Sequence, residues 1–304
     1  MEHRHIGSLS VSRVGLGCNN FGMTIDKRAT ARVVHAALDA GINFFDTADT
    51  YGGTNSERFL GQALGKRRSE AIVATKFGMR AGDEFQGGAR PEYVKRAADA
   101  SLQRLNIERI DLYQLHKPDP SVPIGETLGA MNDLVTAGKV REIGCSNFSV
   151  AQLHDAEAAA KPGAAKFVSL QNEYNLLHRA PEKDVLPECE RLHLAFLPYF
   201  PLASGLLTGK YQKGVPAPKG TRMHLSWAAS ALTDENFRTV EGLRAIAARS
   251  GHSMLQLAFS WLLRHDAVAT VIAGATKPEQ VRANAQAFSW QISKDDLAAI
   301  DSCC

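Results

Sequence analysis

A short apolar run that passes directly into acidic residues and a tyrosine, NFFDTADTYGG over Asn43–Gly53, constrains this sequence most. Its first residues are typical of a buried strand, and Asp46 stands where that strand would end. Tyr51 follows in the next loop, ahead of two glycines and the start of a helix. The stretch therefore predicts a strand that delivers an acid and a tyrosine to one edge of a sheet. Asp49, in the same loop, could be only a cap or a turn former.

Two later apolar runs also end in a titratable residue. The run Ala71–Lys76 ends in a lysine, and the run Arg109–His116 ends in a histidine. Either side chain is costly at the inner end of a buried strand unless it is paired. We therefore expect both to meet Asp46 and Tyr51 at one face, where the four could transfer a proton. Taken singly, each could instead be structural, as a packed tyrosine, a buried ion pair or a satisfied buried histidine.

The order of apolar segments predicts a (β/α)8 TIM barrel. Helical patterns alternate with eight expected strands, at Gly15–Cys18, Phe44–Asp46, Ala71–Lys76, Ile110–His116, Val140–Ser146, Phe167–Gln171, Ala195–Tyr199 and Val268–Ala273. Two short strands around a Gly7-Ser8 turn precede them and predict an N-terminal β-hairpin. No linker or low-complexity segment interrupts the pattern, so residues 1–304 are expected to form a single barrel domain with long loops at its C-terminal face.

Composition excludes several classes of function. The net charge of +3 is spread along the chain, which disfavours a nucleic-acid surface. The five cysteines form no CxxC pair and no zinc-ligand spacing, so no metal site is expected. Their odd number suits a reducing compartment, and no apolar run approaches a membrane-spanning length. We expect a cytoplasmic protein that acts on a small molecule without nucleic-acid or membrane partners, as a monomer or weak homo-oligomer.

Asp46, Tyr51, Lys76 and His116, at these spacings, resemble the catalytic tetrad of the aldo-keto reductase family, in its bacterial NADPH-dependent form. The resemblance extends from GLGCNNFG at Gly15–Gly22 to VIAGATKPEQVRAN near the end of the chain. It implies a barrel closed at the bottom by the hairpin, and a reversible NAD(P)H-dependent reduction of an aldehyde or ketone to the alcohol.

Each member of the tetrad has a role under this resemblance. Tyr51 would give a proton to the carbonyl oxygen while a nicotinamide supplies hydride. Lys76 would lower the pKa of the tyrosine, because an ammonium group favours the phenolate. Asp46 would keep Lys76 charged, and His116 would orient the substrate oxygen.

The resemblance also assigns side chains to NADPH. The nicotinamide carboxamide would be held by Ser146, Asn147 and Gln171, and the nicotinamide ring would stack on Tyr199. The pyrophosphate would lie against a loop that contains Pro201, Leu202, Ser204, Gly205, Leu206 and Lys210. The adenosine phosphate would be bound by an adenosine-phosphate group of residues, Gly274, Thr276, Lys277, Gln280 and Asn284. The last group departs from the family pattern, since Gly274, Gln280 and Ala283 replace a frequent basic residue, arginine and glutamate. The preference for NADPH therefore depends mainly on Lys277, and use of NADH is also compatible with these residues.

Candidate substrate-binding residues are mostly apolar, and they are Phe21, Met23, Phe77, Lys117 and Trp227. The family often carries tryptophan at or beside Asn19–Asn20 and at Lys117. Polar residues at these places favour a polar or hydroxylated carbonyl substrate.

The sequence disfavours two other classes of function. Some relatives of this fold bind the cofactor as redox-sensing accessory subunits of channels with little turnover, although an intact tetrad disfavours this class. A metal-dependent barrel lyase or hydrolase would need a carboxylate and histidine ligand set at successive strand ends, which the sequence lacks.

Overall fold

A computed structural model of the chain describes residues 1–79, 87–217 and 229–304. Its main sheet contains eight parallel strands in the order β10-β3-β4-β5-β6-β7-β8-β9. In chain order the strands are β3 (Val14–Gly17), β4 (Phe44–Asp46), β5 (Ile72–Phe77), β6 (Ile110–Leu115), β7 (Val140–Ser146), β8 (Phe167–Gln171), β9 (Ala195–Phe196) and β10 (Val271–Gly274).

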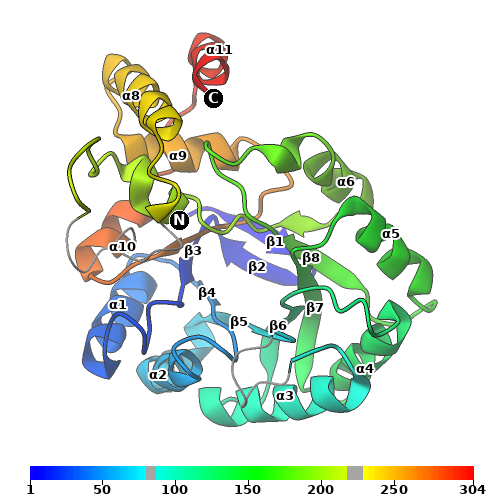
Figure 1. Ribbon diagram of the computed structural model, residues 1–304. Helices are drawn as coiled ribbons and strands as arrows, with labels where there is room; N and C mark the ends of the chain where they lie inside the picture. Colours follow the sequence, from blue (N-terminus) through cyan, green and yellow to red (C-terminus); the bar gives the residue numbers. More distant parts are fainter. Residues whose placement is uncertain (80–86, 218–228) are drawn as a thin grey trace.

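The sheet curls round until its two ends meet (Figure 1). β10 pairs in parallel with β3 on one side. On the other side, the backbone N–H of Ala269 donates to Phe196 O over 3.1 Å, and that of Ile272 donates to Pro198 O over 3.3 Å. The expected (β/α)8 barrel class is therefore confirmed.

The predicted hairpin is also present, as β1 (His3–Ile6) and β2 (Leu9–Ser12) in antiparallel register. Ile6, Leu9 and Val11 are fully buried and share one apolar cluster with side chains from inside the barrel, including Phe44 and Leu112. Figure 1 shows the hairpin crossing the middle of the barrel. It thus closes the end of the barrel opposite the carboxyl ends of the strands.

Helices surround the sheet, with caps that follow from the sequence. The helices are α1 (Lys27–Asp39), α2 (Asn55–Leu64), α3 (Pro91–Leu105), α4 (Ile124–Thr136), α5 (Val150–Ala159), α6 (Val185–Leu192), α8 (Asp234–Arg249), α9 (Met254–Leu263), α10 (Pro278–Ala285) and α11 (Lys294–Cys303), with 3-10 turns η1 (Gly65–Glu70), η2 (Ala180–Glu182) and η3 (Ala203–Thr208). Asp26 caps α1 by accepting from Ala29 N over 2.7 Å. Among the described residues, no helix combines the length and apolarity needed to cross a membrane.

Two expected elements differ from the structure. The sequence pattern predicts one helix over Pro181–Leu192, but the chain forms η2 and then α6. Asp184 causes the break, because its side chain accepts from Val185 N and begins a new helix. The expected strand Ala195–Tyr199 stops after Phe196, close to Pro198, which has no N–H to give to a neighbouring strand.

The alternation of side chains along each strand places polar groups at one end of the barrel. Phe44, Ala74 and Leu112 belong to the apolar cluster at the hairpin end. Two residues further along the same strands lie Asp46, Lys76 and Gln114, all buried. Because successive side chains alternate between faces, these three point into the barrel at its C-terminal mouth. The fold therefore gathers the predicted acid and lysine at the end where barrel enzymes place chemistry.

Glycine at Gly15 is explained by packing. A Cβ atom there would lie 2.8 Å from Phe44 Cδ1 and 3.0 Å from Thr270 Oγ1. The barrel interior leaves no room for a larger residue, so packing explains this glycine without a nucleotide-binding loop.

Candidate active site

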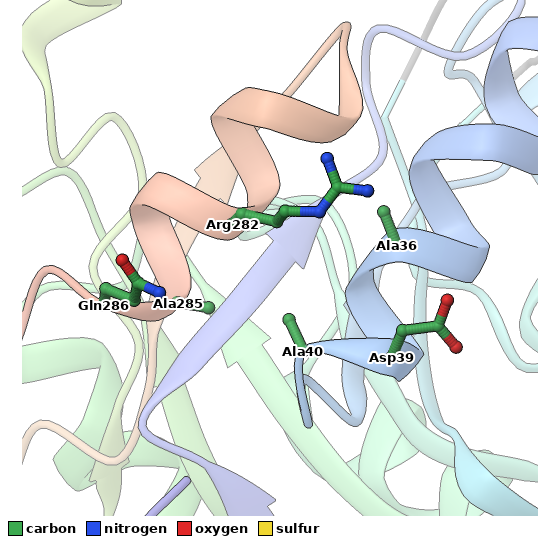
Figure 2. Close-up of a pocket in the computed structure, with 6 residues that line it drawn as sticks. All are labelled: Ala36, Asp39, Ala40, Arg282, Ala285 and Gln286. Carbon is green, nitrogen blue, oxygen red and sulfur yellow. The ribbon is translucent and has the colours of Figure 1, made fainter.

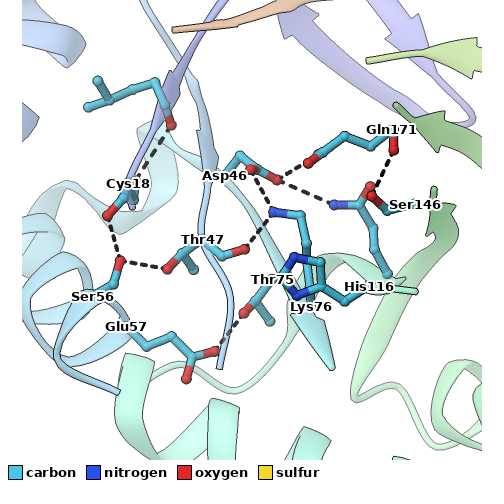
Figure 3. Close-up of polar contacts among 12 residues, drawn as sticks. Cys18, Asp46, Thr47, Ser56, Glu57, Thr75, Lys76, His116, Ser146 and Gln171 are labelled. Carbon is cyan, nitrogen blue, oxygen red and sulfur yellow. Dashed lines mark hydrogen bonds and ion pairs between the residues drawn. The ribbon is translucent and has the colours of Figure 1, made fainter. Parts of the chain in front are cut away.

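The centre of the site is a buried ion pair between Lys76 of β5 and Asp46 of β4 (Figure 3). Lys76 Nζ donates to Asp46 Oδ2 over 2.6 Å and to the Thr47 carbonyl over 2.9 Å. The Lys76 side chain has no exposed surface, and burial alone would lower its pKa. Asp46 and Tyr51 outweigh that effect and raise the pKa of Lys76, so the ammonium is charged at neutral pH.

A second set of hydrogen bonds orients the carboxylate of Asp46. Its Oδ1 accepts from Gln171 Nε2 over 3.0 Å and from Gln114 Nε2 over 3.3 Å. Gln114 escaped sequence reasoning, although it stands two residues before His116 and so shares its inward face. Strands β4, β5, β6 and β8 thus hold Asp46 in one orientation.

Tyr51 lies above this pair in the loop between β4 and α2, and its side chain is partly exposed. Lys76 Nζ is 5.1 Å from the centre of the Tyr51 ring. Backbone bonds fix the loop, since Tyr51 N donates to Ala48 O over 3.2 Å and Tyr51 O accepts from Ser56 N over 3.2 Å. Tyr51 is therefore the most exposed member of the tetrad, and a small molecule at the barrel mouth can reach it.

The expected lowering of the tyrosine pKa is not observed as a net effect. Burial raises the pKa of Tyr51 above 10.0, and the carboxylate of Asp46 adds to the rise. Lys76 acts in the opposite direction, as predicted, but its effect is smaller than that of burial. Tyr51 consequently holds its proton at neutral pH and is suited to act as an acid.

His116 completes the group at the end of β6. Its ring centre lies 5.8 Å from that of Tyr51, in an edge-to-face arrangement. Burial, Lys76 and Lys117 lower its pKa to about 3, so the imidazole is neutral at neutral pH. His116 Nδ1 is buried and has no hydrogen-bond partner among the described residues. The structure thus brings together Asp46, Tyr51, Lys76 and His116.

The residues expected to hold a carboxamide form a neighbouring group at the ends of β7 and β8. Ser146 Oγ donates to Gln171 O over 2.7 Å, and Tyr199 Oη donates to Asn147 Oδ1 over 2.9 Å. Asn147 Nδ2 in turn donates to His116 O over 3.0 Å, and its backbone N–H donates to the side chain of Asn172 over 2.7 Å. Asn172 was missed from the sequence. These bonds join the group to the tetrad.

The expected pyrophosphate loop includes η3 and has an unusual backbone. Ala203, Ser204 and Gly205 have positive φ angles of 44°, 56° and 97°. Non-glycine residues rarely adopt this region, and such strain gathers at ligand sites. Lys210 folds over the loop, because its Nζ would lie 3.1 Å from a Cβ at Gly205. Leu206 is fully buried and offers no surface to a ligand in this conformation.

The adenosine-phosphate group lies at the start of α10, where backbone N–H groups favour an anion. Gln280 Oε1 accepts from Thr276 N over 2.7 Å and from Lys277 N over 3.2 Å. The Gln280 carbonyl therefore already occupies the donors that a phosphate would use. Lys277 and Gly274 are exposed beside it, and Asn284 is buried.

Two expected substrate residues are corrected. Phe77 follows Lys76 and so faces outward, where its ring stacks on Tyr113 at 4.7 Å with no exposed surface. Phe21 is also fully buried in the core cluster. Neither ring offers a surface to a substrate. Met23 and Lys117 are exposed, whereas Trp227 lies outside the described residues.

A cavity of about 280 Å³ lies elsewhere, between α1 and α10 on the outer ring of helices (Figure 2). Its lining residues are Ala36, Asp39, Ala40, Arg282, Ala285 and Gln286. It contains none of the tetrad, so it is separate from the candidate active site.

Comparisons with known proteins agree with this site. A sequence model of the aldo/keto reductase family matches residues 13–304. A probable voltage-gated potassium channel subunit beta from Oryza sativa is 34% identical over 95% of this chain and 91% of its own. The L-glyceraldehyde 3-phosphate reductase of Escherichia coli K12 is 32% identical over 99% of this chain and 92% of its own.

A solved structure, the glycerol dehydrogenase of Gluconobacter oxydans, superposes with a TM-score of 0.87 at 31% identity, covering 99% of this chain and 94% of its own. The sequence match, the relatives and the shared barrel lead to one conclusion. The chain belongs to the aldo/keto reductase family.

Proposed function

We propose that this protein reduces an aldehyde or ketone to the alcohol with NADPH, reversibly, and that Tyr51 is the proton donor. One observation carries the proposal. A fully buried and charged Lys76, held by Asp46, lies 5.1 Å from the ring of a tyrosine that a small molecule can reach. Structural ion pairs occur in many cores, but here the pair lies beneath a partly exposed tyrosine at the barrel mouth.

The residues divide the work of proton transfer. Tyr51 gives its proton to the carbonyl oxygen as that oxygen becomes an alkoxide. The charge of Lys76 then stabilises the phenolate that remains, and Asp46 keeps the ammonium aimed at it. In this proposal neutral His116, whose buried Nδ1 lacks a described partner, hydrogen-bonds the substrate oxygen and fixes its orientation.

The residues around the mouth fit a nicotinamide dinucleotide, which would supply the hydride. The strained backbone at Ala203–Gly205, with Lys210 folded over it, suits a pyrophosphate. Exposed Lys277 at the start of α10 suits a 2′-phosphate and supports NADPH over NADH. A Lys277→Ala variant should weaken NADPH binding by about tenfold and leave NADH binding unchanged, measured by fluorescence titration.

The substrate is proposed to be a small, polar or hydroxylated carbonyl compound. Lys117 is exposed next to His116, and the two apolar rings expected to line the pocket are turned into the core. The named activities of two relatives, on glyceraldehyde 3-phosphate and on glycerol, support the same class.

A carbonyl panel tests the activity. Oxidation of NADPH, and separately of NADH, is followed with glyceraldehyde, dihydroxyacetone, glyceraldehyde 3-phosphate and bulky apolar aldehydes. We expect turnover of the polar compounds that disappears in Tyr51→Phe while NADPH still binds. Faster turnover of the apolar aldehydes would contradict the substrate class, and turnover that survives in Tyr51→Phe would contradict the proton donor.

A second candidate function is a cofactor-binding accessory subunit with little turnover. The relative named as a probable voltage-gated potassium channel subunit beta favours it, since it matches 95% of this chain at 34% identity. NADPH binding without turnover of any compound in the panel would support this candidate over the reductase.

A further inference from the structure

The carboxyl group of Asp49 is buried near the proposed active site without a hydrogen-bonded partner. The residue is 1% exposed, and neither carboxyl oxygen meets a donor among the described residues at hydrogen-bonding distance and angle. Its backbone N–H donates to the carbonyl of Lys76 over 3.1 Å. Asp49 is thereby attached to the strand that carries the tetrad lysine. Its loop also carries Tyr51.

The cations near Asp49 are already committed to other carboxylates. Lys76 pairs with Asp46 at 2.6 Å. Arg104 of α3 donates to Glu57 of α2 over 2.5 Å, and the Glu57 side chain has no exposed surface. The other oxygen of Glu57 accepts from Thr75 Oγ1 over 2.6 Å, as Figure 3 shows.

Two cations, the fully buried Lys76 and the largely buried Arg104, thus face three buried carboxyl groups. The charges balance only when one carboxyl group carries a proton. Asp46 and Glu57 each receive charged donors, whereas Asp49 receives none from the described residues. Asp49 is therefore the group that holds the proton.

We propose that Asp49 is a positioning residue of the active site, held as a neutral acid by the two committed ion pairs, and that its ionisation opposes formation of the Tyr51 phenolate. The inference rests on the proposed role of Tyr51 as proton donor. On ionisation the proton of Asp49 passes to solvent, and one uncompensated negative charge remains beside Lys76. That charge competes with the phenolate for the same ammonium.

The electrostatics around Asp49 agree with this account. Burial and then the charge of Glu57 raise the pKa of Asp49 from 3.8 to about 7, against Arg104, a weak contact with Thr50 N–H and Lys76, which lower it. Two tyrosines also face it, Tyr93 of α3 and Tyr113 of β6. Burial raises the pKa of both, and the charge of Asp49 adds to the rise.

The two directions of the reaction should respond differently. Carbonyl reduction begins with protonated Tyr51, and near pH 6 Asp49 also holds its proton, so reduction measured there should depend little on Asp49. Alcohol oxidation uses the phenolate as a base, so ionised Asp49 moves that activity to higher pH.

The test compares pH profiles of kcat/KM for alcohol oxidation in the wild type and in Asp49→Asn. The kcat/KM for alcohol oxidation rises with pH, and we expect the apparent pKa of that rise to fall by about one unit in Asp49→Asn. On the rising part of the profile, kcat/KM should then be about tenfold higher in the variant. Reduction near pH 6 should agree within about twofold. Asp133→Asn, an exposed aspartate of α4 paired with Lys95, is the matched control and should leave the profile unchanged.

An unshifted profile, or an equal loss at every pH, would overturn the proposal, because either would mean that Asp49 only packs. If Asp49→Asn does not fold, infrared spectroscopy of the wild type decides. We expect the band of a protonated buried carboxyl group that disappears with a midpoint near pH 7, and its absence at pH 6 would overturn the proposal. Tyr51→Phe separates the two claims. Turnover that survives in Tyr51→Phe refutes Tyr51 as the proton donor. Loss of turnover in Tyr51→Phe together with an unshifted pH profile in Asp49→Asn refutes only the role of Asp49.

Discussion

Two tyrosines of this barrel, Tyr51 and Tyr174, stand in similar places and have different surroundings. Each follows the carboxyl end of a strand, Tyr51 after β4 and Tyr174 after β8. Each also lies beside both a cation and a carboxylate. Tyr51 is partly exposed and is 5.1 Å by its ring from Lys76 Nζ. Tyr174 is fully buried and donates its hydroxyl proton to Glu182 over 2.5 Å.

The difference shows that a strand-end tyrosine near charges is not enough for proton transfer. Burial raises the pKa of Tyr174, and its hydrogen bond to Glu182 raises it further, despite the opposing charge of Arg264. Its proton is therefore held by a carboxylate. In Tyr51, the contact with Lys76 acts in the opposite direction and stabilises the phenolate. Tyr51 therefore differs from the structural Tyr174 in two respects, which are its partial exposure and a hydroxyl that is not held by a hydrogen bond to a carboxylate.

Removing the lysine should give the largest effect. In Lys76→Met we expect a loss of about 10²- to 10⁴-fold in kcat and about 3–5 kcal/mol of unfolding free energy, because Asp46 is left buried and unpaired. Urea denaturation and steady-state kinetics measure the two losses. The double variant Lys76→Met/Asp46→Asn should recover most of the stability but not the activity. Recovered activity in the double variant would mean that the pair is only structural.

Removing the structural hydroxyl should cost stability and not activity. Tyr174→Phe loses a buried hydrogen bond to a charged acceptor, so we expect a loss of about 1.5–3 kcal/mol in unfolding free energy. Its kcat/KM should stay within about threefold of the wild type. A large loss of activity in the folded variant would remove the distinction between the two tyrosines.

The acids beside the two tyrosines should affect stability with opposite signs of pH dependence. The pKa of Glu182 is lowered in the folded state, where the hydrogen bonds from Arg179 and Tyr174 outweigh burial. Its contribution to stability is therefore present above about pH 4.5 and is lost as the pH falls. The pKa of Asp49 is raised from 3.8 to about 7, so its contribution is present below about pH 4 and is lost as the pH rises to about 7.

Denaturation of two variants measures these signs. Glu182→Gln should lose about 1–2 kcal/mol near pH 7 and less near pH 4. Asp49→Asn should gain stability relative to the wild type between about pH 5 and about pH 8. The same sign of pH dependence for both would contradict the assigned surroundings.

The smallest expected effect concerns His116. Its pKa, lowered to about 3, keeps the ring neutral throughout the working range. The kcat/KM for carbonyl reduction should therefore show no step near pH 6.5, the ordinary value for histidine. A fall in activity with a midpoint near that pH, abolished in His116→Gln, would show that the ring titrates and that its burial is less complete than the structure indicates.

Much of the barrel and the position of the tetrad could be predicted from the sequence. Strands with one polar residue at the end of an apolar run bring Asp46, Lys76 and His116 to the same edge, whatever the details of the loops. The alternation of side chains along a strand also predicts that Phe77, next to the inward Lys76, points away from the site. It predicts likewise that Gln114, two residues before His116, points into the barrel. Both follow from a period of two along the strand.

The remaining features depend on contacts between distant elements. The pairing of Arg104 with Glu57 joins α3 to α2, and it leaves the Asp49 carboxyl group without a hydrogen-bonded cation in the described part of the chain. Gln171 donates to Asp46 across 125 positions of sequence, and no local pattern indicates that bond. The balance between burial and the charge of Lys76 at Tyr51 likewise depends on how completely the loop covers the ring, which propensity does not determine.

The most direct test of the central claim compares Tyr51→Phe with Tyr174→Phe in carbonyl reduction, with the dissociation constant of NADPH measured for both. If Tyr51 is the proton donor, its variant loses at least about a thousandfold in kcat/KM while NADPH binding changes by less than about threefold. Tyr174→Phe should then keep wild-type activity. If Tyr51→Phe keeps more than about a tenth of the activity, or if the two variants lose activity alike, the account is contradicted.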